Sequence, residues 1–181
     1  MASALLLIDI QNDYFPDGAL PVEGSGAAAA RAAELLAAWR RRDWPLVHIR
    51  HESVRPGAGF LLPGTIGAEI HPALAPMAGE PVVVKHYPNG FRATGLAEIL
   101  AGRDVDNVVV AGMMTQMCID ATVRAAFDRG LICQVAADAC AARAASFGGQ
   151  AVPAAQVHAA FLAALDGVFA RVRTVAELLP S

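Results

Sequence analysis

The sequence has few cysteines, and their spacing excludes the common frameworks built from them. Only three occur in 181 residues, Cys118, Cys133 and Cys140, so a fully paired set of disulfides is not indicated. No CxxC pair is present, which argues against a zinc ribbon. A chain of this kind suits a reducing compartment, and we predict a cytoplasmic protein.

The chain also lacks a strong charge of either sign. Fourteen Lys and Arg residues stand against seventeen Asp and Glu residues, which gives a formal net charge of −3. No basic run exceeds the triplet at 40–42, which ends an alanine-rich segment where cations complement a helix dipole. We therefore expect no nucleic-acid-binding surface.

Long hydrophobic runs are missing as well. The apolar stretch at 4–10 is too short to cross a membrane and has no basic segment before it, so we predict neither a membrane span nor a signal peptide. No GxGxxG or GxxxxGK[ST] pattern follows a predicted strand, which weakens any assignment as a nucleotide-binding module. We expect no cofactor.

What the sequence does contain is an alternation of apolar, β-branched runs with helical patterns. The patterns predict strands at 4–10, 45–50, 81–85, 108–110, 131–137 and 172–175, and helices at 26–42, 94–101, from 118 onward, and 153–169. We predict one domain over residues 1–181, a three-layer α/β/α, Rossmann-like fold with a six-stranded, mostly parallel sheet. The Gly- and Pro-rich connection at 52–80 is long enough to form a wall or lid over a site.

One segment, at 107–130, carries a candidate nucleophile. A buried strand passes through Gly112 into a turn, and a helical pattern begins at Cys118. Thr115 is placed to cap that helix, which puts Cys118 in the first turn, where the helix dipole and free N–H groups favour a thiolate. From this segment alone a buried structural cysteine is an equal alternative.

Three reactive side chains occupy equivalent positions along the chain. Asp9, Lys85 and Cys118 each fall at or just beyond the C-terminal end of a predicted strand. Open parallel sheets bind ligands at that edge, where the winding direction reverses. Asp9 alone could cap a loop and Lys85 alone could be a surface lysine, but charges that interrupt apolar strands are costly to bury unpaired. We predict that the carboxylate, the ammonium and the thiol meet in one site.

Four segments in order resemble the motifs of the isochorismatase-like cysteine hydrolases, the superfamily that includes nicotinamidases and N-carbamoylsarcosine amidohydrolase. They are LLLIDIQNDYF, FLLPGTIGAEIHPALAP, VVVKHYPNGF and VVVAGMMTQMCIDATVRAAFDRG, and the similarity runs nearly end to end. The resemblance implies a triad of Cys118, Asp9 and Lys85, and a cis peptide bond between Met113 and Met114. It also implies hydrolysis of a small-molecule amide through a thioester, with the oxyanion held by the backbone N–H groups of Met114 and Cys118.

Two departures from the family pattern bear on the substrate. Nicotinamidases often carry an Asp-x-His metal motif after the second strand, but here the segment reads HIRHESVRPG. His48 and His51 are three apart on a strand and point to opposite faces, so we predict no metal, and nicotinamide becomes a less expected substrate. Gln116 stands where many relatives have histidine, and no consequence is assigned to it.

The remaining predictions concern the walls of the site and the assembly. Tyr14, Phe60 and Phe91 are candidates to hold a flat or apolar acyl group, with ordinary loop packing as the alternative for each. The resemblance implies a homodimer or larger homo-oligomer, with the surface at 113–117 and the 52–80 loop as candidate contacts. We interpret three histidines as structural or exposed: His71, His86 and His158. We interpret the other two cysteines, Cys133 and Cys140, as non-catalytic.

Two other functions stay open at this point. The same scaffold can hydrolyse a vinyl ether or an ester, although isochorismatases proper lack the cysteine, so Cys118 argues against vinyl-ether cleavage. The chain can also be a catalytically silent α/β binding module. In each case the expected partner is a small molecule.

Overall fold

A computed structural model describes residues 2–179, which are built around a six-stranded sheet. The strand order is β3-β2-β1-β4-β5-β8, and every neighbouring pair is parallel. The strands are β1 (Ala2–Ile8), β2 (Leu46–His51), β3 (Val82–Lys85), β4 (Val105–Met113), β5 (Ile132–Ala141) and β8 (Arg171–Arg173). The predicted six-stranded α/β fold is confirmed, with a main sheet that is wholly rather than mostly parallel.

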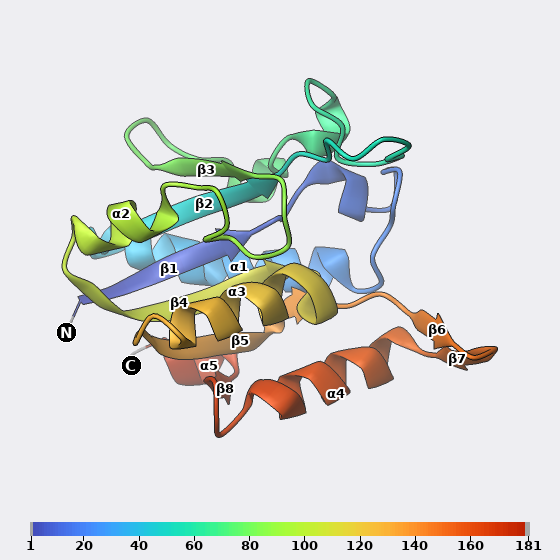
Figure 1. Ribbon diagram of the computed structural model, residues 1–181. Coiled ribbons are helices and arrows are strands. Elements are labelled where there is room, and N and C mark those ends of the chain that lie inside the picture. The colour runs from blue at the N-terminus through green and yellow to red at the C-terminus, as the bar shows by residue number, and fades with distance from the viewer. Residues whose placement is uncertain (1, 180–181) are drawn as a thin grey trace.

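Helices cover both faces of this sheet (Figure 1). One face carries α1 (Ser25–Arg41) and α5 (Val175–Leu178), and the other carries α2 (Leu96–Ala101), α3 (Asp120–Phe127) and α4 (Ala154–Leu165). Successive residues of β1 alternate between the two cores, Leu5 and Leu7 on the α1 side and Leu6 and Ile8 on the other. This is why the strand reads as a continuous apolar run.

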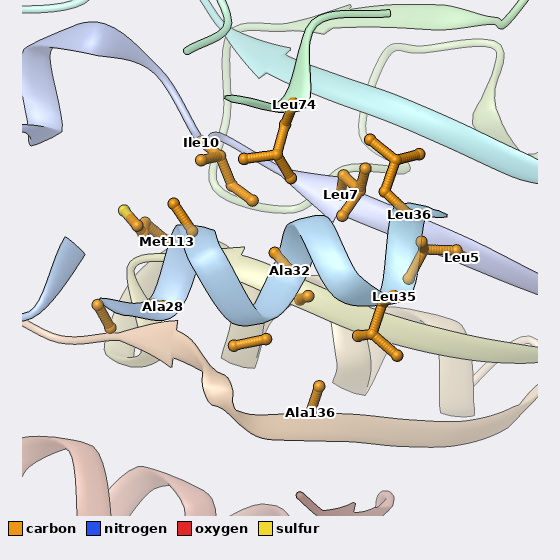
Figure 2. Packing of buried hydrophobic residues seen from close by; sticks show 14 of the residues in the cluster. Leu5, Leu7, Ile10, Ala28, Ala32, Leu35, Leu36, Leu74, Met113 and Ala136 are labelled. Atoms are coloured by element: carbon orange, nitrogen blue, oxygen red, sulfur yellow. The ribbon is translucent and has the colours of Figure 1, made fainter. Parts of the chain in front are cut away.

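The packing of α1 shows how its alanine-rich sequence is used. Ala28, Ala32 and Leu35 follow one another along the helix and face the sheet, where Ala136 of β5 lies opposite (Figure 2). Small side chains let the helix backbone approach the strands closely, and the longer Leu35 fills the space at one end.

The winding of the sheet reverses between β1 and β4. From β1 the chain adds β2 and β3 on one side, and from β4 it adds β5 and β8 on the other. At the C-terminal end of this central pair Gly112 lies opposite Ile8 with a φ of 134°. A Cβ at position 112 would overlap the carbonyl oxygen of Ile8, so only glycine fits where these two strands pair.

The connection after β5 is more ordered than the sequence indicates. β5 continues to Ala141, and β6 (Ala145–Phe147) and β7 (Gln150–Val152) then form an antiparallel hairpin that projects from the body as an arm (Figure 1). Gly148 and Gly149, both with positive φ, make its turn. Strands of three residues that bury no alternate side chain leave almost no periodic signal, which explains why this hairpin was not predicted.

Within the described residues, no helix has both the length and the apolar character needed to span a membrane.

Candidate active site

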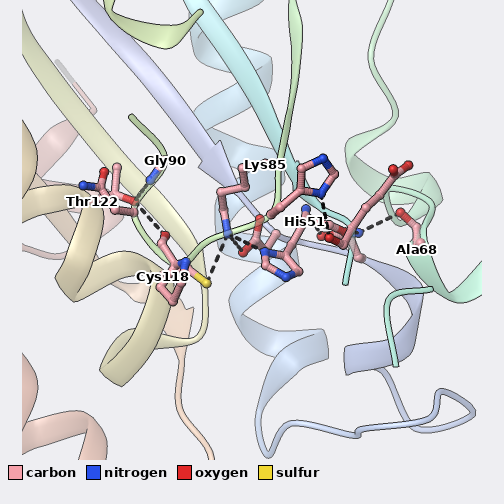
Figure 3. A network of polar contacts seen from close by, with 12 residues as sticks. His51, Ala68, Lys85, Gly90, Cys118 and Thr122 are labelled. Atoms are coloured by element: carbon pink, nitrogen blue, oxygen red, sulfur yellow. Dashed lines mark hydrogen bonds and ion pairs between the residues drawn. The ribbon is translucent and has the colours of Figure 1, made fainter. Parts of the chain in front are cut away.

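Asp9, Lys85 and Cys118 come together at the C-terminal edge of the sheet. Asp9 directly follows β1, Lys85 is the last residue of β3, and Cys118 lies in the turn after β4. Lys85 Nζ lies 2.6 Å from Asp9 Oδ2 and donates a hydrogen bond of 3.3 Å to Cys118 Sγ (Figure 3). All three side chains are buried.

Asp9 leaves the strand in an unusual backbone conformation. Its φ is 51°, in the left-handed region that aspartate tolerates better than most residues. Its N–H still donates to the carbonyl of Ile49 on β2 at 2.8 Å, so the residue is held at the strand end. Strained backbone of this kind concentrates at functional sites.

Cys118 lies in a π-helical turn, Thr115–Ile119, that precedes α3. The peptide bond between Met113 and Met114 is cis, at the position that the resemblance implied. The prediction that Thr115 caps the helix is wrong, because its buried hydroxyl is bonded to Nδ1 of His158 on α4 at 2.9 Å. The turn is therefore held from a neighbouring helix rather than by its own cap.

The charges around the thiol act in opposite directions. Burial, and after it the charge of Asp9, raise the pKa of the Cys118 thiol far above its ordinary value, and Lys85 lowers it only in part. Burial lowers the pKa of Lys85, but Asp9 and Cys118 outweigh that effect and the net shift is upward. Burial of the thiol therefore opposes the thiolate that the start of the helix was expected to favour, and Lys85 is the neighbour that works against this effect of burial.

His51, at the end of β2, is a fourth member of this group. Its Nδ1 lies 3.2 Å from Lys85 Nζ. Gln11 holds the backbone of His51 from both sides, accepting from its N–H at 2.7 Å and donating to its carbonyl at 2.8 Å. The same amide donates to the carbonyl of Ala68 in the long loop at 2.7 Å, so strand end and loop are tied together (Figure 3).

A second buried carboxylate, Asp13, anchors the loops above the site. It accepts from the N–H of Leu61 at 2.5 Å and from the N–H of Ala19 at 3.1 Å. Gly67 packs so closely against this carboxylate that a Cβ there would overlap it. Sequence reasoning missed Asp13, Gln11 and His51, although each lies at or just after a predicted strand end, where the rule that selected Asp9 also applies.

A cavity of about 440 Å³ opens beside Cys118. Tyr14 and Phe60, two of the candidates for a wall of the site, both line it, with ring centroids 6.3 Å apart. Arg55 is the only Lys, Arg, Asp or Glu residue among its lining residues, which are Tyr14, His51, Ser53, Val54, Arg55, Phe60, His86, Tyr87, Pro88, Met114, Met117 and Cys118. A larger hollow of about 570 Å³ lies at the opposite edge of the sheet, near Leu46 and Pro81, and contains none of the triad residues.

Phe91, the third candidate for a wall of the site, does not line this cavity. The segment before it is pinned to α3, where Gly90 N–H donates to Thr122 Oγ1 at 2.9 Å (Figure 3). That contact turns the Phe91 ring into the core on the α3 side, with the Arg129 guanidinium 4.5 Å from the ring centroid. Gln116 is not among the lining residues either, and its side-chain amide donates to the carbonyl of Arg143 at 3.0 Å.

Among residues 2–179, no group of three or more His, Cys, Asp or Glu side chains is arranged to hold a metal ion. His48, the other histidine of β2, is buried and bonded to Glu80 Oε2 at 2.9 Å. The absence of a metal requirement stays a prediction.

The fold and the edge site both correspond to a known family. A family model described as the Isochorismatase domain matches residues 3–177. The chain belongs to the isochorismatase family.

Three similar proteins cover between 70% and 99% of the chain. An uncharacterized isochorismatase family protein of Bacillus subtilis (strain 168) is 46% identical over 179 residues, 99% of each chain. Maleamate amidohydrolase of Pseudomonas putida is 38% identical over 141 residues, 70% of this chain and 66% of the relative. A solved structure from Oleispira antarctica, assigned to the isochorismatase hydrolases, matches with a TM-score of 0.95 at 49% identity, covering 98% of this chain and 96% of that one.

Proposed function

We propose that this protein is a cysteine-dependent hydrolase that cleaves the carbon–nitrogen bond of a small amide through a thioester. One observation carries the proposal: a buried ammonium, Lys85, bridges the Asp9 carboxylate and the Cys118 thiol at the base of a cavity. The family is one of hydrolases, and the relative maleamate amidohydrolase is named for amide cleavage, which supports this choice of bond.

In the first half of the reaction Cys118 attacks the amide carbonyl. Because the pKa of the buried thiol is raised, the sulfur needs a base, and Asp9 accepts its proton as the new bond forms. Lys85 stabilises the developing thiolate through the contact it already makes. The oxyanion binds the backbone N–H groups of Met114 and Cys118, and such donors typically contribute about 3 kcal/mol each.

The first half ends when Asp9, now protonated, gives its proton to the departing ammonia or amine as the carbon–nitrogen bond breaks and the thioester forms. In the second half the Asp9 carboxylate takes a proton from a water molecule, whose oxygen attacks the thioester carbonyl. The carbon–sulfur bond then breaks, and Asp9 returns that proton to the Cys118 sulfur. The products are a carboxylic acid and the regenerated thiol, and the net reaction consumes one water per amide.

The lining of the cavity suggests which amides to test first. It is mostly apolar, and Arg55 is its one formally charged side chain. Among the described residues Arg55 has no carboxylate partner within ion-pair distance, so it is available to an anionic group of a substrate. We infer that amides carrying a carboxylate will bind more tightly than their neutral counterparts.

A panel of amides and ureides, scored by ammonia release, tests the proposal. We expect the wild type and the matched control Cys133→Ala to hydrolyse at least one member, and Cys118→Ala to lose about 1,000-fold or more in rate. Undiminished turnover by Cys118→Ala would overturn the proposal. Activity confined to esters or vinyl ethers would favour those reactions on the same scaffold, and no turnover at all would favour a silent binding module.

A further inference from the structure

We propose that His51 is a positioning residue for the reaction, accepting the third proton of the Lys85 ammonium and so fixing that ammonium between Asp9 and Cys118. This inference rests on the proposed function for its kinetic consequences, but its structural core concerns the resting protein alone.

The argument starts from the donor count of a lysine. An ammonium group has three N–H donors and no acceptor. Lys85 Nζ has three polar neighbours at contact distance: Asp9 Oδ2 at 2.6 Å, Cys118 Sγ at 3.3 Å and His51 Nδ1 at 3.2 Å. The side chain is fully buried, so no solvent is available to replace a missing partner. His51 therefore supplies the third acceptor for the Lys85 ammonium. Without His51, one buried N–H group of that ammonium would have no hydrogen-bond partner.

The same count fixes the proton on the imidazole. Because an ammonium can only donate, Nδ1 of His51 must present its lone pair, and a neutral ring then carries its proton on Nε2. Burial lowers the pKa of His51, and the Lys85 charge and His86 lower it further, while Asp9 and Glu52 act in the opposite direction. The net downward shift agrees with a ring that stays neutral near neutral pH.

The placement of His51 also connects the triad to the substrate cavity. Its backbone is clamped by Gln11, and its ring both contacts Lys85 and lines the cavity beside Cys118. A histidine whose only task was packing would not need its acceptor nitrogen aimed at a buried ammonium.

Loss of this acceptor should affect the chemical step more than binding. Without His51 the ammonium is held by two partners, so its position against the thiolate becomes less exact in the transition state. Protonation of His51 has the same effect, because an imidazolium cannot accept from Lys85 and repels it. Activity should therefore decline as the pH falls through the lowered pKa of His51.

Two substitutions separate the acceptor from the bulk of the ring. His51→Asn retains an acceptor oxygen close to the position of Nδ1 and cannot titrate, whereas His51→Leu keeps similar bulk and has no acceptor. His71→Asn is the matched control, because His71 stacks on Phe15 and contacts no triad residue. We expect His51→Leu to lose about 10–100-fold in kcat with a small change in KM, as supporting residues of catalytic groups typically do. His51→Asn should keep most of the activity and lose the acid limb of the wild-type pH profile.

A substrate-free measurement decides the structural part. Long-range ¹H–¹⁵N correlation spectra of the histidine-labelled protein, with the His51 signals assigned through His51→Asn, should show the Nε2–H tautomer at neutral pH and titration below the ordinary histidine range. A protonated Nδ1 at neutral pH, or equal kcat for the Leu and Asn variants, would overturn the inference. If the Leu variant does not fold, the spectra and the pH profile of His51→Asn still decide it. Failure of the amide panel with the expected spectra would count against the proposed function and not against the Lys85–His51 contact.

Discussion

The Cys118 thiol is governed by two neighbours with opposite charge. Asp9 raises the pKa of the thiol and Lys85 lowers it. Burial has the largest effect and raises the pKa in the same direction as Asp9. Because the effects of Asp9 and Lys85 differ in sign, replacing either neighbour should change thiol reactivity in a direction that identifies its role. A structural cysteine in a hydrocarbon core would show no such pair of responses.

Alkylation by iodoacetamide at neutral pH measures this directly. Asp9→Asn removes the like charge, so we expect Cys118 to react faster, by roughly 10-fold, even as turnover is lost for want of a base. Lys85→Met removes the stabilising cation and should slow the same alkylation. Mass mapping separates Cys118 from Cys133 and Cys140. Equal slowing by both substitutions would show that the two side chains do not act on the thiol electrostatically.

Sequence reasoning identified Asp9, Lys85 and Cys118 because each interrupts or ends an apolar pattern. Gln11, Asp13 and His51 also lie near strand ends, but their roles depend on partners far along the chain, such as Leu61 and Ala68. The local sequence pattern shows that a polar residue lies near a strand end, but it does not show which distant residue that side chain is hydrogen-bonded to.

At the scale of elements, the parallel strands and long helices were predictable because they bury apolar faces with a clear period. The hairpin of β6 and β7 has no fully buried residue. The π-helical turn before α3 is contacted by another helix, through the hydrogen bond between Thr115 and His158. The direction of Phe91 was set by Gly90 against Thr122, again a contact between segments that no local pattern shows.

The close pairing of β1 and β4 at Gly112 provides a prediction about the elements. Gly112→Ala should destabilise the protein by several kcal/mol, about 3 or more, because its Cβ meets the Ile8 carbonyl and its φ is unfavourable for alanine. Gly26→Ala in α1 is the matched control: nothing lies within 4 Å of its added Cβ, and alanine favours the helix by up to about 1 kcal/mol. Urea unfolding measures both. A neutral Gly112→Ala variant would contradict the close approach of these strands.

For the whole molecule, Glu80 ties the end of the long loop to α1 and β2. Its carboxylate accepts from Arg40 Nε at 2.7 Å, Arg40 Nη2 at 2.8 Å and the N–H of Met77 at 2.8 Å, and contacts His48 at 2.9 Å. The hydrogen bonds from Arg40 are the largest cause that lowers its pKa from 4.5 to about 2. Because the folded-state pKa is depressed, this stabilisation is present above pH 4.5 and is lost as the pH falls toward about 2.

Acid unfolding tests that assignment. Solvent screening limits the contribution of Glu80 to roughly 1–2 kcal/mol. We expect the unfolding free energy of the wild type to fall more steeply with acid than that of Glu80→Gln, so the two curves converge at low pH. Glu69→Gln, exposed on the same loop, should follow the wild-type curve. Parallel curves for the wild type and Glu80→Gln would remove the claim.

The expected homodimer or larger assembly stays a prediction. The contact surface was proposed at 113–117. Met113 is buried in the core and cannot take part in a contact between subunits, whereas Met117 is 45% exposed. The β6–β7 arm carries Phe147 at 91% exposure, and a two-stranded hairpin on its own is marginally stable in water. Sedimentation equilibrium should give at least twice the chain mass of 18.8 kDa, and a monomer at micromolar concentration would contradict the expectation.

The central claim is that Cys118 forms a covalent bond to the acyl group of its substrate. Rapid acid quenching during turnover of an amide identified by the panel, followed by peptide mass mapping, measures this most directly. We predict that the peptide containing Cys118 gains the mass of the acyl group, and that the adduct disappears when the substrate is exhausted. Steady turnover with no adduct at Cys118, or with the acyl group on another residue, would contradict the account.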